Sequence, residues 1–64
     1  MLGVMQTIQA TYDKVDFSLE DLESLAVEML KEHSSEELIN MNYFNFNKTV
    51  NKAVKKVELK ENLN

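Results

Sequence analysis

The stretch SLEDLESLAVEMLKEH, residues 18–33, decides the fold. Its apolar residues recur at intervals of three and four, which is the period of one face of an α-helix. They are Leu19, Leu22, Leu25, Ala26, Met29 and Leu30. Ser18 and Asp21 have the spacing of a capping box, and Lys31 falls in the last turn, where the helix dipole favours positive charge. The pattern predicts a helix over about residues 19–33.

A second helix is expected to begin almost at once, because Ser34 and Glu37 repeat the capping-box spacing. Further along, apolar residues follow one another at intervals of 4, 3, 4, 3 and 4, which is an unbroken heptad seam. The seam consists of Ile39, Tyr43, Phe46, Val50, Ala53 and Val57. It predicts one long helix over about residues 35–59. Residues 42–47 are the expected place for a kink, since asparagines and aromatics are poor helix formers. Residues 60–64 are expected to fray.

The N-terminal segment allows two interpretations. Apolar residues at intervals of 4, 3, 4 and 3 favour a helix over about residues 2–14. These are Met1, Met5, Ile8, Tyr12 and Val15. Within residues 5–12, a threonine-rich alternation is typical of a strand, with Gln6, Ile8, Ala10 and Tyr12 on one face and Thr7, Gln9 and Thr11 on the other. The helix is preferred, and the strand stays open as the alternative. In the link that follows, Phe17 stands just before the cap of the next helix and is expected to pack on Leu22 as a hydrophobic staple.

These elements predict a single all-α domain over residues 1–64. Its three helices, over about 2–14, 19–33 and 35–59, would form a small bundle or helical hairpin. A chain of 64 residues buries only about 60% of its unfolded surface, so its stability is marginal. It has no cysteine and therefore no disulfide to help. We expect support from association through the long C-terminal helix, as a homodimer or with another protein.

Composition argues against an enzyme. A serine nucleophile needs an adjacent base, and the only histidine, His33, has Ser34 and Ser35 as sequence neighbours that do not face it on a helix. Gly3 is the only glycine, so no glycine-rich phosphate loop is present. One histidine without cysteine does not supply the three or four converging ligands of a zinc site. We expect neither catalysis nor a cofactor, metal ion or small-molecule substrate.

The net charge of −4 conceals an uneven distribution. Residues 13–37 carry nine acids and two lysines, whereas residues 38–64 carry five lysines and two glutamates. Oppositely charged segments attract when they lie antiparallel, which favours a hairpin. Four of the lysines recur every fourth residue and form a basic stripe, namely Lys48, Lys52, Lys56 and Lys60. Because the chain is acidic and has no arginine, ion pairing or solvation explains this stripe better than contact with nucleic-acid phosphates.

The aromatic cluster of the third segment is the candidate partner interface, consisting of Tyr43, Phe44 and Phe46 with Val50. Tyr43 and Phe46 lie on the seam and are expected in the core. Phe44 lies off the seam and should be exposed in a monomer. Aromatic side chains are enriched at the energetic centres of protein interfaces, so Phe44 is a candidate for an intermolecular contact.

If residues 5–12 form a strand, the order strand, helix, short turn, helix resembles the ribbon-helix-helix repressors over about 35 residues, with residues 33–39 as the turn that starts the second helix. The resemblance implies a dimer whose paired strands enter the major groove of DNA. Thr7, Gln9 and Thr11 would then read base edges, as in antitoxins and copy-control regulators of plasmids. The strand has no basic residue, so it lacks the charge that supplies most DNA affinity. DNA binding is therefore the alternative function.

The expected function is that of a small non-catalytic protein-binding factor, with an accessory, inhibitory or regulatory role. A structural subunit of a larger assembly is a further alternative. The N-terminus has no basic start, and no segment has the ~20 apolar residues that cross a membrane, so a cytoplasmic location is expected. The absence of arginine and the seven asparagines are typical of AT-rich coding sequences, such as those of phages and plasmids of low-GC bacteria.

Overall fold

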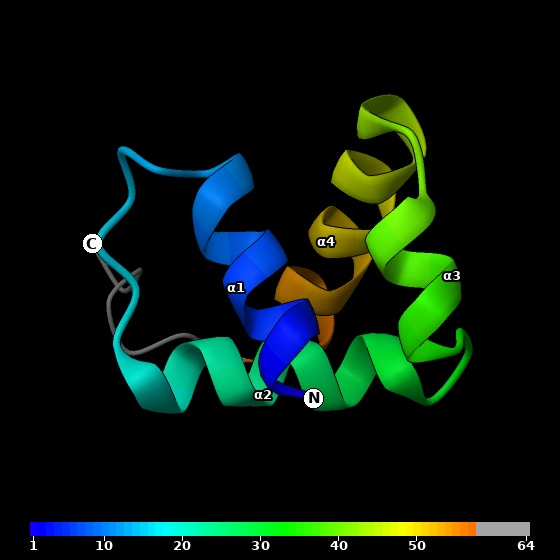
Figure 1. Cartoon of the computed structure of the whole chain (residues 1–64). Coiled ribbons are helices and arrows are strands. Elements are labelled where there is room, and N and C mark those ends of the chain that lie inside the picture. The colour runs from blue at the N-terminus through cyan, green and yellow to red at the C-terminus, as the bar shows by residue number, and fades with distance from the viewer. Residues whose placement is uncertain (58–64) are drawn as a thin grey trace.

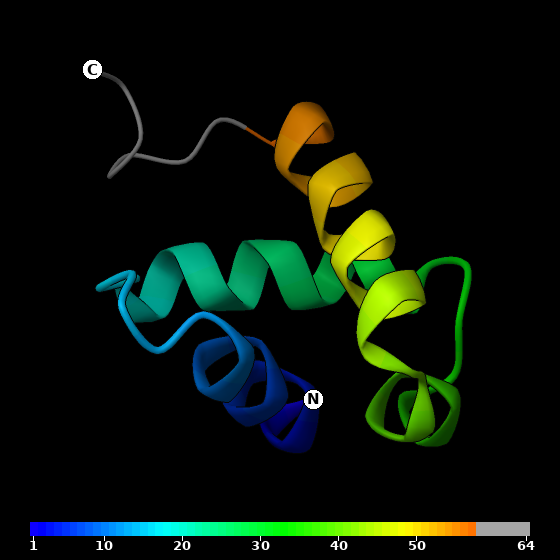
Figure 2. The same ribbon diagram turned by 90° about the horizontal axis from the view of Figure 1, so that it is seen from above.

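The computed structural model describes residues 1–57 and shows four α-helices in this part of the chain (Figure 1). They are α1 (Leu2–Thr11), α2 (Leu19–Leu30), α3 (Ser35–Asn40) and α4 (Tyr43–Lys56). α2 contacts both α1 and α4, and α1 also contacts α3. Figure 2 shows α4 crossing α2 near the C-terminal end of α2. The predicted all-α class is confirmed, with four helices instead of three.

α1 covers most of the segment that allowed two interpretations. No strand occurs within residues 1–57, so the alternative strand over 5–12 is wrong. The helix ends at Thr11, earlier than the expected residue 14, because Tyr12 leaves helical geometry with φ −116° and ψ 59°. The side-chain amide of Gln9 donates to the carbonyl oxygens of Tyr12 (3.2 Å) and Val15 (2.9 Å). These hydrogen bonds from Gln9 fix the backbone that follows the C-terminal end of α1.

α2 begins where its capping residue predicts. The Ser18 hydroxyl oxygen accepts a hydrogen bond from the Asp21 backbone N–H at 3.1 Å, which satisfies one of the free donors of the first turn. Phe17, just before this cap, packs on the core. Its ring lies edge to face with the Tyr12 ring, and the two ring centroids are 6.4 Å apart. The helix ends at Leu30, three residues short of the predicted end, and residues 31–33 form a turn.

The predicted single helix over 35–59 is wrong, since two extended residues separate α3 from α4. Met41 has φ −68° and ψ 143°, and Asn42 has φ −70° and ψ 162°. The Asn42 side chain accepts from the Asn45 backbone N–H at 2.8 Å and so caps α4. Asparagine is a strong N-cap and a weak interior helix residue, which explains why the chain restarts here. The end of the predicted helix beyond 57, and the predicted fraying of 60–64, lie outside the described residues.

This break changes which residues of the seam are buried. Phe46, Val50 and Ala53 lie in the core, each no more than 4% exposed, which was expected for Phe46, whereas Val50 was expected at a partner interface. Two other seam residues are not buried. Ile39, near the end of α3, is 48% exposed, and Tyr43, the first residue of α4, is 66% exposed. The heptad register therefore holds only within α4. On α3 the buried residue is Leu38, the neighbour of Ile39.

The core receives side chains from all four helices, which explains why the short α3 is held in place. Its members are Val4, Met5, Ile8, Leu25, Ala26, Met29, Leu38, Phe46, Val50 and Ala53. The face of α4 that was expected to pair with a second copy is thus covered by the chain's own α2. Any association must use another surface.

Candidate protein-binding surface

The most exposed aromatic side chains stand together in the first turn of α4. Tyr43 is 66% exposed and Phe44 68% exposed. The prediction of an exposed Phe44 is confirmed, and that of a buried Tyr43 is wrong. The two other residues of the predicted interface, Phe46 and Val50, are each only 3% exposed and belong to the core. The structure therefore brings Tyr43 and Phe44 to the surface and withdraws Phe46 and Val50 from it.

Lysines continue this exposed face along the helix. The Lys48 ammonium lies over the Phe44 ring, 5.2 Å from its centroid, at a distance where a cation is attracted to the face of an aromatic ring. Lys52 follows one turn later and is also exposed. We call Tyr43, Phe44, Lys48 and Lys52 the aromatic–lysine surface.

A groove of about 400 Å³ borders this surface between α4 and the ends of α2 and α3. Its floor includes the buried Met29 and Ala53. The α4 wall carries Lys48, Lys52 and Lys56, and the opposite wall carries Glu28, Glu32 and Glu37. The groove is thus apolar at its base and has one basic and one acidic wall.

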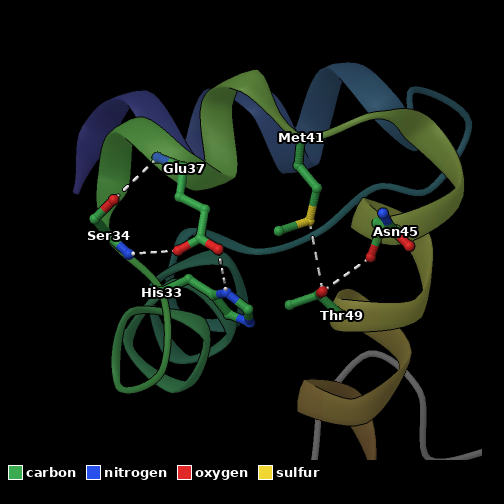
Figure 3. Close-up of polar contacts among 6 residues, drawn as sticks. All are labelled: His33, Ser34, Glu37, Met41, Asn45 and Thr49. Carbon is green, nitrogen blue, oxygen red and sulfur yellow. Dashed lines mark hydrogen bonds and ion pairs between the residues drawn. The ribbon is translucent and has the colours of Figure 1, made fainter.

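The acidic wall is held by contacts around the start of α3 (Figure 3). The Ser34 hydroxyl accepts from the Glu37 backbone N–H at 3.0 Å, and the Ser34 backbone N–H donates to the Glu37 carboxylate at 3.3 Å, which completes the predicted capping box. The Glu37 carboxylate also lies 3.3 Å from His33 Nδ1, close enough for an ion pair but without the geometry of a hydrogen bond. The His33 ring therefore faces a carboxylate of the groove wall and not a serine hydroxyl.

On the α4 side, Thr49 fixes the inner edge of the groove. Its hydroxyl lies 2.9 Å from the Asn45 carbonyl oxygen and 3.6 Å from the Met41 sulfur (Figure 3). The contact with Met41 ties the extended link between α3 and α4 back onto α4.

The charges of the two walls are unequally compensated. Lys31 lies 2.8 Å from Glu28, and its hydrogen bond lowers the pKa of that carboxyl, an effect that burial opposes. Glu32 meets Lys56 across the groove at 3.6 Å. Each glutamate of the acidic wall therefore has a cationic or histidine neighbour. Among the described residues, neither Lys48 nor Lys52 has a carboxylate within ion-pair distance, which leaves unpaired positive charge beside Phe44.

A contact from α1 steadies the start of α4. The Tyr12 hydroxyl donates to the side-chain oxygen of Asn47, one turn beyond the exposed aromatics. Burial raises the pKa of Tyr12, and the nearby Tyr43 hydroxyl raises it further. The aromatic–lysine surface is thus carried by a helix that packs on α2 and is also held by Tyr12, just after α1, and Met41, just after α3.

The residues expected to read DNA in the alternative interpretation have other roles. The Thr7 hydroxyl donates to the Gly3 carbonyl oxygen within α1 at 2.8 Å, and Gln9 holds the end of that helix. Thr7 and Thr11 line a shallow uncharged groove beside Ile39 of α3. They share a helix face and not the alternating face of a strand.

Two further features of residues 1–57 concern metal binding and membrane crossing. No group of three or more histidine, cysteine or carboxylate side chains is placed to hold a metal ion in this part of the chain. Within the same residues, no helix combines the length and the apolar character that crossing a bilayer requires.

Comparisons of the chain with models of protein families, with curated proteins and with solved structures found no match. Its function therefore has to be inferred from its own residues.

Sequence reasoning missed the exposure of Tyr43 and the pairing of Phe44 with Lys48. Both follow from the restart of the helix at Asn42. The sequence contained the signal. Asn42 is a residue type that favours the N-cap position, and an N-cap side chain accepts a hydrogen bond from the backbone N–H three residues later, here that of Asn45. The continuous seam concealed this signal.

Proposed function

We propose that this chain is a small non-catalytic protein-binding factor that acts through its aromatic–lysine surface. The observation that carries the proposal is the exposure of Tyr43 and Phe44, two of the five aromatic residues in the chain. Burying a large apolar side chain contributes roughly 1.5–3 kcal/mol. An exposed aromatic pair of this kind gains that energy only when a partner covers it.

The surface is also well prepared for binding. Asn42 caps the helix that carries it, and the Tyr12–Asn47 hydrogen bond ties that helix to α1. Lys48 lies over one face of the Phe44 ring, and this attraction favours one arrangement of the two side chains. A side chain that is ordered before binding loses less conformational entropy when the partner arrives. This arrangement supports an accessory, inhibitory or regulatory role in which the chain occupies a surface of another protein.

The contacts of the groove favour binding over catalysis. His33, the only histidine, faces Glu37, and Glu28 and Glu32 face lysines. A general base needs a proton donor of the substrate within hydrogen-bond reach, whereas these carboxylates are occupied by partners on the same chain. The proposal accordingly assigns the groove walls a structural and electrostatic role.

Capture experiments test the proposal. The tagged wild-type chain and its Phe44→Ala variant would be used to recover partners from the cells that encode it. Losing a hot-spot aromatic costs about 2 kcal/mol or more, which is roughly a 30-fold loss of affinity. The matched control is Val27→Ala, which trims another exposed apolar side chain (42%) on α2. The proposal fails if the folded Phe44→Ala variant recovers every partner as well as the control does.

A further inference from the structure

The lysines of the aromatic–lysine surface, which have no ion-pair partner within residues 1–57, favour an acidic partner. Lys48 and Lys52 have no carboxylate within ion-pair distance among the described residues, while Lys56 already meets Glu32. Phe44, 68% exposed, lies beside them. A complementary partner would therefore present carboxylates next to exposed apolar side chains.

Such a segment exists on the chain itself. Residues 13–23, from the link after α1 into the first turns of α2, carry one lysine and five carboxylates, of which Asp21 is buried. Two apolar side chains on this segment are exposed, Val15 at 44% and Leu19 at 72%. Asp13 and Asp16 are exposed beside them. Exposed acids thus lie next to exposed apolar groups in this segment, as lysines lie next to an aromatic ring on α4.

Within one molecule the two surfaces do not meet. Figures 1 and 2 place the link between α1 and α2 on the opposite side of the molecule from the first turn of α4. The ion pair that joins α2 to α4 among the described residues lies at the C-terminal ends of both helices, between Glu32 and Lys56. The acidic segment can therefore reach the aromatic–lysine surface only from a second molecule.

We propose that the aromatic–lysine surface binds the acidic segment of residues 13–23 from a second copy of this chain. The inference rests on the proposed function and names the chemistry of one partner. Leu19 or Val15 would cover the Phe44 ring, and Asp13 and Asp16 would approach Lys48 and Lys52. In this contact the aspartates of one copy compensate the lysines of the other. Two copies that each carry a net charge of −4 would thus associate through surfaces of opposite charge.

A peptide segment fits this surface better than a nucleic acid. The wall opposite Lys48 and Lys52 carries Glu28, Glu32 and Glu37. A phosphate backbone that follows the groove would bring a row of negative charges close to these glutamates. A peptide can place one or two carboxylates at the lysines and an apolar group over Phe44, and the glutamates then stay at a distance.

Sedimentation equilibrium up to about 1 mM, a concentration that reveals even weak complexes, measures the association directly. We expect the wild type to self-associate, and Lys48→Glu to weaken the association at least about tenfold, because like charges then face each other. The matched control is the pair Gln6→Glu and Ala10→Glu on the exposed face of α1. Both variants shift the net charge from −4 to −6, so only the location of the charge differs.

A charge swap identifies the two surfaces as partners. The double variant Lys48→Glu/Lys52→Glu and the double variant Asp13→Lys/Asp16→Lys should each remain monomeric alone, and they should associate when mixed. Recovery in the mixture also shows that both variants are folded. Association of either double variant alone at wild-type strength would place the contact elsewhere and overturn the proposal.

The remaining outcomes separate this proposal from the proposed function. A wild type that stays monomeric to about 1 mM overturns self-association. Loss of other captured proteins on Phe44→Ala would in that case still support protein binding. Salt-sensitive binding of a single-stranded oligonucleotide, lost in Lys48→Glu, would overturn the proposal in favour of a nucleic acid.

Discussion

At the scale of single residues, Leu25 stands at the centre of the packing. It is fully buried, whereas Leu22, the centre of the same face in the sequence pattern, is only half-buried. Helical periodicity identifies a face but does not show how deeply neighbouring helices cover each position on it. Here α1 and α4 both pack on α2, and this packing buries Leu25, Ala26 and Met29.

Leu25→Ala should therefore cost roughly 2–5 kcal/mol of unfolding free energy. With a total stability near the lower limit of about 5 kcal/mol, the variant should be largely unfolded. Leu22→Ala should cost less, and Leu19→Ala, at a residue 72% exposed, should stay within about 0.5 kcal/mol of the wild type. Urea denaturation measures all three, and equal midpoints for Leu25→Ala and Leu19→Ala would contradict the described core.

Tyr12 makes a prediction about pH. Its pKa is raised above the ordinary 10.0, first by burial and then by Tyr43, so the folded state favours the neutral phenol. The stabilisation is complete below pH 10 and is lost as the pH rises through the folded pKa. Wild-type stability should fall more steeply than that of Tyr12→Phe between pH 9 and about pH 11. Parallel curves in urea denaturation would show that Tyr12 ionises equally easily in both states.

At the scale of the helix, caps were the most reliable sequence signal. Ser18 and Ser34 mark the starts of α2 and α3 where predicted. The start of α4 was missed because Asn42 lies inside a seam whose spacing continues without interruption. A heptad pattern says which residues would share a face if the helix were continuous. Whether the helix is continuous depends on local hydrogen bonds that compete with those of the helix. The Asn42 side chain accepts such a bond from the Asn45 backbone N–H and so favours a new helix start.

Asn42→Ala tests this competition. Loss of the N-cap should cost roughly 0.5–2 kcal/mol, and the Asn45 backbone N–H, which donates to Asn42 at 2.8 Å, should exchange its hydrogen faster. Asn42→Asp keeps an acceptor at the cap and should stay close to the wild type. Urea denaturation and amide hydrogen exchange report the two effects. An unchanged exchange rate at Asn45 in the alanine variant would show that the cap does not protect this turn.

At the scale of the whole molecule, the uneven charge predicted a hairpin of the acidic and basic segments. α2 and α4 do contact each other, but the ion pair between them among the described residues is Glu32–Lys56. Both helices also contribute apolar side chains to the buried core, such as Leu25 from α2 and Val50 from α4. An exposed ion pair contributes little, so burial sets the arrangement. Within residues 1–57, Lys48 and Lys52 have no carboxylate at ion-pair distance, and the proposed contact would use these charges.

The last prediction separates protein binding from DNA reading. It compares Phe44→Ala with the triple variant Thr7→Ala, Gln9→Ala and Thr11→Ala. The triple variant loses hydrogen bonds within and just beyond α1, but alanine is the best helix former, so it should stay folded.

For a protein-binding factor, Phe44→Ala should abolish capture of the partner, and the triple variant should capture it normally. For a protein that reads base edges, the triple variant should lose the discrimination between duplexes, at about 1–3 kcal/mol for each good base contact. Fluorescence anisotropy with duplex DNA at two salt concentrations measures that alternative, because phosphate contacts weaken steeply with salt. We expect no specific DNA binding, since α1 presents Thr7 and Thr11 toward Ile39 and carries no basic side chain. Salt-sensitive binding of the wild type below micromolar concentration, lost in the triple variant, would contradict the proposed function.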